Sequence, residues 1–384
     1  MKRLCVLILT LLSVSLFAQA PETLTGDQLA KGLVNLGNTR NLQTVFFNAD
    51  HGKEISCAVI GSQIAAGSGS SSWNSNWIGI VSKAIYKKHP YINLKVNDCS
   101  MYMSDPEQGA MLLPALLKSD PLDLAFAAYS ETDEYSKAAC EGIIRQLLAR
   151  GSAIIWILPP DREAAREQTE LIKHYGIVGV DALKAVEDSI DSGLIDPETD
   201  FFNEKHQPTD LFYSYVAQII TDKLIDHSVK SGKKYVMPEP LVSDLFEYTS
   251  FVSPARTRPL SSNGFRLRTE PNTWGAYNQY RKMWVANEPG SAMTCQAEGT
   301  YIDIVIKKRA TDGGFIEVSV DGGEPVMVDC SYPDGWDTWN RYNVASGLKP
   351  GLHEVTLTVS EEIPQGSTDT YVQVCGLMTG GIEK

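Results

Sequence analysis

The sequence CAVIGSQIAAGSG, residues 57–69, decides the fold expected for this chain. An apolar run typical of a buried strand leads into a turn at Gly61, and a serine- and glycine-rich loop then leads into an amphipathic stretch. A strand followed directly by a helix is the unit from which helix-covered parallel sheets are built. Further short apolar runs alternate with helical patterns, at residues 92–96, 122–128, 153–158 and 176–180. We therefore predict a flavodoxin-like, three-layer α/β domain over residues 55–236, whose ligands bind beyond the carboxyl ends of the strands.

The last third of the chain has a different periodicity. Beyond residue 264, apolar and polar residues alternate with the period of two expected of half-buried strands, and Asp-Gly-Gly at 312–314 and 321–323 supplies tight hairpin turns. We predict an all-β, jelly-roll-like sandwich over residues 264–384. Four prolines fall within residues 237–263, so this segment is predicted to be a linker laid over the surface. Residues 21–54 are a lead-in to the first domain.

The first 20 residues have the pattern of a secretory signal peptide. Lys2 and Arg3 precede an apolar run, and Ala18-Gln19-Ala20 is a small-residue cleavage site. The mature protein is therefore predicted to be periplasmic or secreted, with cleavage near Ala20. Its net charge changes from −13 to −15 without Lys2 and Arg3, which makes nucleic acid and anionic membranes poor partners. No later segment approaches the roughly 18 continuous apolar residues that a membrane span needs.

Six cysteines remain once Cys5 is removed with the signal, three in each half of the chain. None are spaced as Cys-x-x-Cys, the pattern of many metal and redox sites. We predict mostly free, structural thiols and neither a metal nor a cofactor, although the export route would permit a disulfide.

Five short motifs in the first domain occur in the order found in SGNH/GDSL hydrolases. They are GSQI at 61–64, YINLKVN at 91–97, LDLAF at 122–126, EGIIRQ at 141–146 and PTDL at 208–211. The chain thus resembles secreted bacterial carbohydrate esterases of this family over about half its length. The resemblance implies a serine ester hydrolase fold that needs no cofactor, with its site at the carboxyl ends of the strands.

The positions that carry the family's chemistry are substituted here. Gln63 stands where the family has its serine nucleophile, and an amide cannot form an acyl-enzyme. Residues 98–108 lack the glycine whose amide helps to hold the oxyanion. In the third block, Ser130 and Thr132 replace glycine and asparagine, which removes a second oxyanion donor. Losing one such donor typically costs about 100- to 1,000-fold in turnover.

The fourth block, Asp-x-x-His-Pro in the family, aligns in two ways. Without a gap, Glu204 replaces the aspartate and Gln207 replaces the histidine, so no general base remains. With a one-residue insertion, His206 is the histidine, and Asn203 replaces the carboxylate that would orient it. We favour the first alignment, because the Pro-Thr-Asp at 208–210 then leads directly into the next helix.

Three functions follow from these substitutions. The leading prediction is a non-catalytic protein with a degenerate active site that recognises a glycan or another hydroxyl-rich ligand. The alternative is an active ester hydrolase, of the polysaccharide deacetylase type, with an unconventional set around His206, Glu204 or Ser62. Ser62 is adjacent to the nucleophile position and is expected to point away from it. The third is a structural or partner-binding role in an exported assembly.

Two groups of residues are candidates for the ligand site. The polar residues at the substituted block positions either form a hydrogen-bonding pocket or are substitutions that accumulated in a site that no longer has a function. Trp336 and Trp339 lie in a short loop that can present aromatic faces to sugar rings, although tryptophans there are also typical of sandwich core or interdomain packing. The predicted ligand-binding residues are Gln63, Ser130, Thr132, Glu204, His206, Trp336 and Trp339, with Gln207 at the fourth-block position.

Overall fold

The computed structural model describes residues 22–102, 104–118, 121–130, 134–225, 235–271, 273, 275–333 and 335–383. The predicted signal peptide and Thr132 lie outside the described residues. Within the described part of the chain, no helix has the length and apolar character needed to span a membrane.

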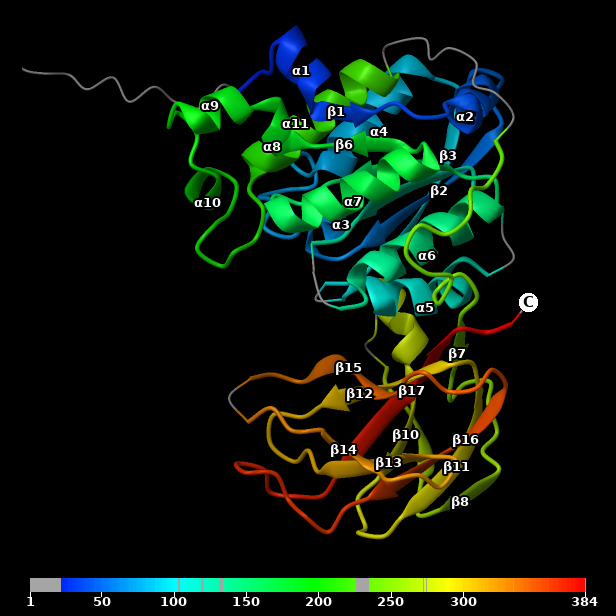
Figure 1. Cartoon of the computed structure of the whole chain (residues 1–384). Coiled ribbons are helices and arrows are strands. Elements are labelled where there is room, and N and C mark those ends of the chain that lie inside the picture. Colours follow the sequence, from blue (N-terminus) through cyan, green and yellow to red (C-terminus); the bar gives the residue numbers. More distant parts are fainter. Residues whose placement is uncertain are drawn as a thin grey trace, which may run out of the picture.

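The first domain is a parallel sheet covered by helices on both faces (Figure 1). Its strands are β1 (Leu33–Asn35), β2 (Glu54–Gly61), β3 (Asn93–Ser100), β4 (Leu124–Ala128), β5 (Ala153–Ile157) and β6 (Val178–Val180). They are arranged in the order β1-β6-β5-β4-β2-β3, and only β1 pairs antiparallel among these described strands. Counted from β2, the parallel strands follow the flavodoxin-like order 2-1-3-4-5, so the predicted α/β class is confirmed.

Several helices of this domain begin at a residue whose side chain caps the free backbone N–H groups. The helices are α1 (Gly26–Gly32), α2 (Arg40–Asp50), α3 (Gln63–Ala66), α4 (Trp77–Lys88), α5 (Pro106–Leu117), α6 (Ser136–Ala149), α7 (Arg162–Tyr175), α8 (Ala182–Ala185), α9 (Glu187–Asp191), α10 (Pro197–Asp200) and α11 (Asp210–Ile220), followed by a π-helical turn (Thr221–Ile225). Asp105 and Asp161 cap α5 and α7 by accepting hydrogen bonds from the backbone N–H groups of Gln108 and Ala164. Gly176, with a φ of 58°, ends α7 in the left-handed conformation.

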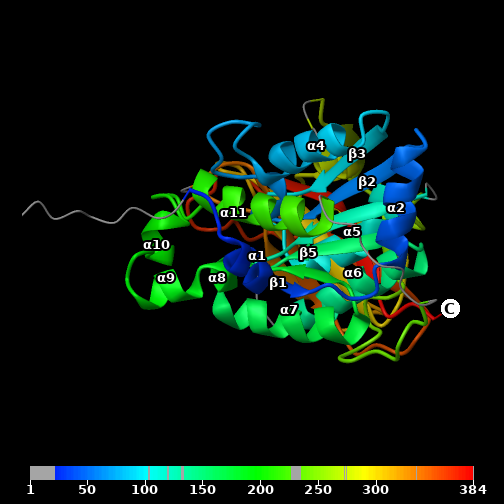
Figure 2. The same ribbon diagram turned by 90° about the horizontal axis from the view of Figure 1, so that it is seen from above.

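Two hydrophobic cores lie on the two faces of the parallel sheet. One core packs β2, β4 and β5 against α2, α4 and α11. The other packs the opposite faces of these strands against α5, α6 and α7. Figure 2 shows α4 and α7 at opposite sides of the sheet.

The second domain is a sandwich of two antiparallel sheets, as predicted. Its strands are β7 (Ser250–Val252), β8 (Ser261–Asn263), β9 (Arg266–Thr269), β10 (Lys282–Ala286), β11 (Ala292–Glu298), β12 (Tyr301–Lys308), β13 (Phe315–Val320), β14 (Val326–Asp329), β15 (Thr338–Ala345), β16 (Leu352–Val359) and β17 (Val372–Gly380). One sheet has the order β15-β12-β17-β10-β9, with β7 also paired to β17, and the other has the order β14-β13-β16-β11-β8. A 3-10 helix (Gly275–Tyr280) precedes β10.

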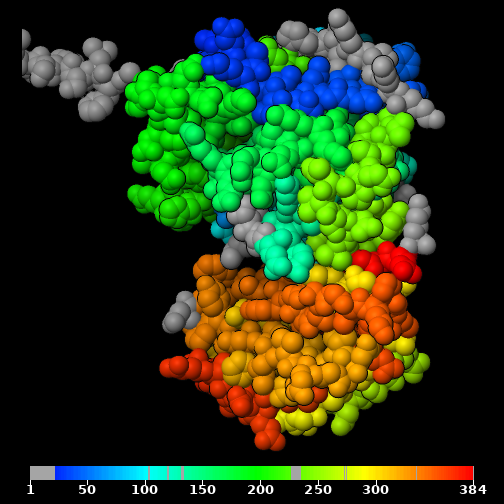
Figure 3. Space-filling view, in the orientation of Figure 1, coloured from blue at the N-terminus to red at the C-terminus, as the bar shows by residue number. Residues whose placement is uncertain are grey.

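The two domains share a hydrophobic core. Phe246, Tyr280, Tyr301 and Cys375 lie in the same buried cluster as residues of α5 and α6. Figure 3 shows the surfaces of the two domains meeting. The sandwich is therefore packed against the α/β domain, and the relative position of the two is fixed by buried contacts.

Residues 237–263, predicted as a surface linker, are built into both domains. Phe246 is fully buried in the shared core, β7 pairs with β17, and β8 pairs with β11. The buried carboxylate of Glu141 in α6 accepts hydrogen bonds from the backbone N–H groups of residues 241–243. Most residues of this segment are exposed or half-buried, but it also supplies two strands to the sandwich and the Phe246 side chain to the shared core, so it is more than a connector.

The six cysteines of the described residues are all free and buried, as predicted. Burial raises the pKa of the Cys57, Cys99, Cys295, Cys330 and Cys375 thiols, that of Cys295 to about 11 and that of Cys99 to about 12. Thiols that are buried and protonated at neutral pH are unreactive. The cysteines are core residues.

Candidate functional site

The carboxyl ends of the parallel strands and one edge of the sandwich enclose a hollow of about 460 Å³, which we call the interdomain cleft. It is lined by Ala66, Ser68, Asp98, Ser100, Tyr102, Gln207, Tyr277, Trp336, Asp337, Thr338 and Trp339. The first six belong to the α/β domain and the last five to the sandwich. The cleft thus lies where an open α/β sheet binds its ligands, and the second domain provides its other side.

The α/β side of the cleft is polar. The carboxylate of Asp98 accepts hydrogen bonds from the Ser100 backbone N–H (3.0 Å) and hydroxyl (2.5 Å), so these two side chains at the end of β3 are held together. The side-chain amide of Gln207 donates to the Tyr102 hydroxyl over 3.4 Å. This side therefore presents a carboxylate, hydroxyls and an amide, which are the groups that hydrogen-bond to a hydroxyl-rich ligand.

The sandwich side of the cleft is aromatic. The rings of Trp339 and Tyr277 lie 4.7 Å apart at 34°, and the Lys307 ammonium lies 5.4 Å from the centre of the Trp339 ring. The Tyr277 hydroxyl donates to the Tyr102 carbonyl oxygen, and burial raises its pKa to about 12, so it stays protonated. Trp339 is therefore both packed into the domain interface and part of the cleft lining.

Trp336 is the exposed aromatic residue of this side. Its side chain is 60% exposed, and its ring lies edge-on to Tyr332 with centres 6.1 Å apart. The next residue, Asp337, is held by the guanidinium of Arg309 and accepts a hydrogen bond from the Ala310 N–H over 3.2 Å. The loop that presents Trp336 is thus anchored by charge and hydrogen bonds, while the indole itself is available to a ligand.

The turn at residues 61–64 has a backbone geometry that requires glycine at its start. Gly61 has a φ of 140°, and a Cβ there would clash with the Ala128 carbonyl oxygen, so only glycine fits. Ser62 is fully buried, with its hydroxyl 3.5 Å from that of Ser130 at the end of β4. Gln63 is the first residue of α3, in the place of the nucleophile. The buried Tyr213 hydroxyl donates to the Ser68 carbonyl oxygen over 2.8 Å and holds this loop in place.

The fourth-block turn separates Gln207 from His206. Asn203 accepts hydrogen bonds from the backbone N–H groups of Lys205 (2.9 Å) and Gln207 (3.1 Å), which closes the turn. His206 has a φ of 52°, and its side chain lines another hollow, beside Arg162. Gln207 alone of this turn lines the cleft, while Glu204 is exposed.

The structure therefore brings together some of the predicted site residues and separates others. Gln207, Trp336 and Trp339 line one cleft, whereas His206 lies in another hollow and Ser62 is buried. The contribution of Tyr102 and Tyr277 was not predicted. Tyr102 stands where the family's second block expects a small residue, and this substitution was the available signal.

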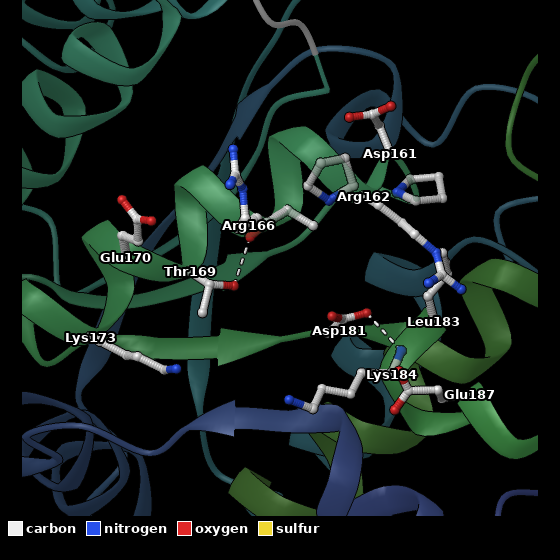
Figure 4. Close-up of a pocket in the computed structure, with 13 residues that line it drawn as sticks. Asp161, Arg162, Arg166, Thr169, Glu170, Lys173, Asp181, Leu183, Lys184 and Glu187 are labelled. Carbon is white, nitrogen blue, oxygen red and sulfur yellow. Dashed lines mark hydrogen bonds between the residues drawn. The ribbon is translucent and has the colours of Figure 1, made fainter.

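A second hollow, of about 510 Å³, lies between α7 and the α8–α9 segment (Figure 4). Arg162, Arg166, Lys173 and Lys184 line it, together with carboxylates that are engaged elsewhere: Asp181 caps α8, and Glu170 pairs with Lys137. None of the predicted site residues lines this hollow. Among the described residues, no three His, Cys, Asp or Glu side chains form a group that could hold a metal ion.

Comparison with known proteins agrees with this architecture. Residues 277–376 match the family model described as "Carbohydrate esterase 2 N-terminal". The matched region here follows the α/β domain and forms most of the sandwich. None of the curated proteins compared with the chain matches it.

Two solved structures resemble the whole chain. Both are of a two-domain esterase (CEX) active on acetylated mannans, one of them co-crystallised with mannopentaose. The match to the complex has a TM-score of 0.80 and 19% sequence identity, and it covers 93% of this chain and 98% of the esterase. The match to the other structure has a TM-score of 0.81 and 18% sequence identity, and it covers 92% of this chain and 99% of the esterase. The two-domain fold predicted from the sequence is therefore confirmed: this chain is similar in fold to a two-domain carbohydrate esterase, with a parallel α/β domain followed by a β-sandwich, and its sandwich matches a carbohydrate esterase family model.

Proposed function

We propose that this protein is an exported, non-catalytic glycan-binding protein that holds a polysaccharide in the interdomain cleft. The observation that carries the proposal is the composition of that cleft, where Gln207, Tyr102 and Asp98 face Trp336 and Trp339. Aromatic faces stack on the apolar faces of sugar rings, and amides, carboxylates and hydroxyls bind their hydroxyl groups.

The residues at the catalytic positions support binding without hydrolysis. Gln63 cannot act as a nucleophile, and the amide of Gln207 cannot accept a proton at neutral pH as a histidine does. The remaining candidates are badly placed: Ser62 is fully buried, and His206 lines a different hollow. An ester bound in the cleft would therefore meet neither the serine nor the histidine that the resemblance places there.

The similar two-domain esterase suggests which ligand to test first. That enzyme is active on acetylated mannans and was crystallised with mannopentaose. Since this chain shares its two-domain fold, we propose a mannan-type oligosaccharide as the ligand class. Hydrogen bonds from the polar side and stacking on Trp336 would then supply most of the affinity.

Titration calorimetry with mannopentaose tests the proposal. Trp336→Ala removes an exposed stacking face, and an aromatic contribution of about 0.5–1.5 kcal/mol corresponds to a two- to tenfold weaker Kd. Gln207→Ala should weaken binding by a similar factor through the loss of a hydrogen bond. Tyr91→Ala is the matched control, because Tyr91 is 80% exposed but lies before β3, at the opposite end of that strand from the cleft.

Two results would overturn the proposal. The first is the absence of measurable binding to mannopentaose and to an array of other neutral glycans, which would favour the partner-binding role. The second is release of acetate from acetylated mannan above the buffer rate, abolished by Ser62→Ala or His206→Ala. That result would establish the protein as an esterase with an unconventional catalytic set.

A further inference from the structure

Arg341 of β15 is a buried cation at the boundary between the domains. Its side chain is 10% exposed, and its Nη1 donates to the carboxylate of Asp303 over 2.6 Å and to the Tyr301 hydroxyl over 3.3 Å. Asp303 is itself fully buried and also accepts a hydrogen bond from the Asn343 amide over 2.9 Å. One end of the guanidinium is thus fixed within the sandwich.

The other end of the same guanidinium binds the α/β domain. Its Nε lies 3.2 and 3.1 Å from the two oxygens of Asp105, and its Nη2 lies 3.0 Å from Asp105 Oδ2. Nη2 also lies 3.7 Å from Oε2 of Glu107, whose side chain is buried. Asp105 is in turn fixed as the N-cap of α5, so the contact reaches a rigid element.

These contacts join the two chain segments that form the cleft. Trp339 lies two residues before Arg341 on β15, and alternate residues of a strand share a face. Tyr102 lies three residues before Asp105 on the opposite side of the cleft. Between them, Tyr277 packs against the Trp339 ring and donates to the Tyr102 carbonyl oxygen.

We propose that Arg341 is a positioning residue that fixes the distance between the polar and the aromatic side of the interdomain cleft. The expected effect of Arg341 on ligand affinity rests on the proposed glycan-binding function. Its effect on the distance between the two sides of the cleft does not, because that distance is a property of the ligand-free protein. The planar guanidinium is suited to it, because its nitrogens bond in two directions at once.

The charge balance explains why no neutral residue can replace it. Three carboxylates, those of Asp105, Glu107 and Asp303, converge on this single cation. Burial opposes the charged form of Arg341, but the three carboxylates prevail and raise its pKa, so it remains a cation. Without Arg341, negatively charged carboxylates from the two domains would face each other in a poorly solvated interface, and their repulsion would favour separation of the domains.

The direct test measures the distance between the domains without any ligand. Nitroxide labels are attached at Lys87→Cys on α4 and Glu361→Cys after β16, both exposed positions, while the native cysteines of the described residues are buried. The protein with Arg341 should give one narrow distance distribution by pulsed dipolar spectroscopy. Arg341→Met should broaden it, and the Kd for mannopentaose should rise at least tenfold.

Arg145→Met is the matched control. Arg145 is a similarly buried guanidinium that bonds to Glu247 over 2.6 Å and to the Pro238 carbonyl oxygen, so its loss also breaks a buried ion pair. It does not contact the cleft segments. Its loss should lower the melting temperature while leaving the distance distribution and the Kd unchanged. Arg341→Lys keeps the charge but not the two-directional bonding, and should restore only part of the affinity.

The outcomes separate the positioning role from the proposed function. If wild-type protein binds no mannopentaose, the proposed function fails, and the distance distributions still test the role of Arg341. A distribution that Arg341→Met leaves as narrow as the wild type overturns the inference, whatever the titration shows. If that variant does not fold, Asp105→Asn replaces it, because asparagine preserves the helix cap and removes the charge that Arg341 binds. The same broadening is expected, and its absence would overturn the inference.

Discussion

Replacing Glu141 should release residues 241–243 from the α/β domain. Glu141 is fully buried in α6, and its carboxylate accepts hydrogen bonds from the backbone N–H groups of Leu241 (2.5 Å), Val242 (2.8 Å) and Ser243 (2.8 Å). The Tyr175 hydroxyl donates to it as well, over 2.5 Å. No other side chain of the described residues is shown bonding to these three N–H groups, so Glu141→Ala leaves them without an acceptor from the protein.

The expected cost follows from these four bonds. A hydrogen bond to a charged group contributes about 1.5–3 kcal/mol, so four of them set an upper limit of roughly 6–12 kcal/mol. Leu241 and Val242 are partly exposed, so water can replace most of the lost acceptors once the segment opens locally. We therefore expect Glu141→Ala to lower the free energy of unfolding by about 3 kcal/mol and Glu141→Gln, which retains one acceptor oxygen, by about half as much.

Urea denaturation followed by circular dichroism measures this loss, and limited proteolysis locates it. In the wild type, chymotrypsin should not cut at Phe246, because this side chain is fully buried in the shared core. In Glu141→Ala, cleavage should appear near Leu241 and Phe246. Glu170→Gln is the control, since the Glu170–Lys137 pair is exposed and such pairs contribute about 0–1 kcal/mol. Equal stability losses in the Glu141 and Glu170 variants, with the segment still resistant, would refute the reasoning.

Three further outcomes are expected. Gly142→Ala should destabilise the protein, because the new Cβ would lie 2.5 Å from Phe246 Cβ, and thermal melting measures the loss. The His353–Asp321 pair raises the pKa of His353 above 6.5 and lowers the pKa of Asp321 below 3.8. The pair therefore stabilises the folded protein most between about pH 4 and 6.5, and this stabilisation is lost as the pH rises through the folded-state pKa of His353. The melting temperature of His353→Asn should therefore approach that of the wild type at alkaline pH, and a constant gap would contradict this. Gln63→Ser should not create esterase activity on an activated acetyl ester, because Gln207 still replaces the base; activity above the buffer rate would show otherwise.

The parallel sheet could be predicted because its strands are buried on both faces. β5 is found at Ala153–Ile157 within the apolar run predicted at 153–158, since such runs have few alternatives in a parallel sheet. β1 was not predicted, because Leu33–Asn35 is a half-buried edge strand of three residues with no apolar pattern of its own. Its pairing with β6 depends on the tertiary structure.

The path of residues 237–263 could not be read from local sequence. Prolines correctly indicate that the segment forms neither a helix nor a central strand. Where its backbone contacts the α/β domain depends on Glu141 and Gly142, which are about 100 positions away in the sequence. Glu141 is fully buried near Arg145, one helical turn further along α6, and the burial of these polar side chains is visible only once the helix is placed.

Residues on both sides of the candidate site could be predicted, Gln207 on the α/β side and Trp336 and Trp339 on the sandwich side, but not how the two sides meet. Motif order places Gln63, Ser130 and Gln207 at the carboxyl ends of strands, and the structure locates Gln207 in the cleft there. The aromatic side depends on how the sandwich docks, which is set by contacts such as Arg341 with Asp105. The two possible roles of Trp339, in packing or in the cleft, also turned out to be compatible.

The geometry of the turn at residues 61–64 supports the proposed use of this site in binding. Gly61 keeps the conformation that brings the turn against the Ala128 carbonyl, and Tyr213 still holds the loop that follows. The Gly61 conformation costs conformational freedom, and the buried Tyr213 hydroxyl requires a hydrogen-bond partner. Neither feature has an advantage in a site that has lost its function. The Tyr213 hydrogen bond holds the backbone at Ser68, which lies on the cleft surface opposite the tryptophans. Binding requires such an arrangement as much as catalysis does, whereas a nucleophile and a base serve catalysis alone, and in the alignment that we favour amides stand at those two positions.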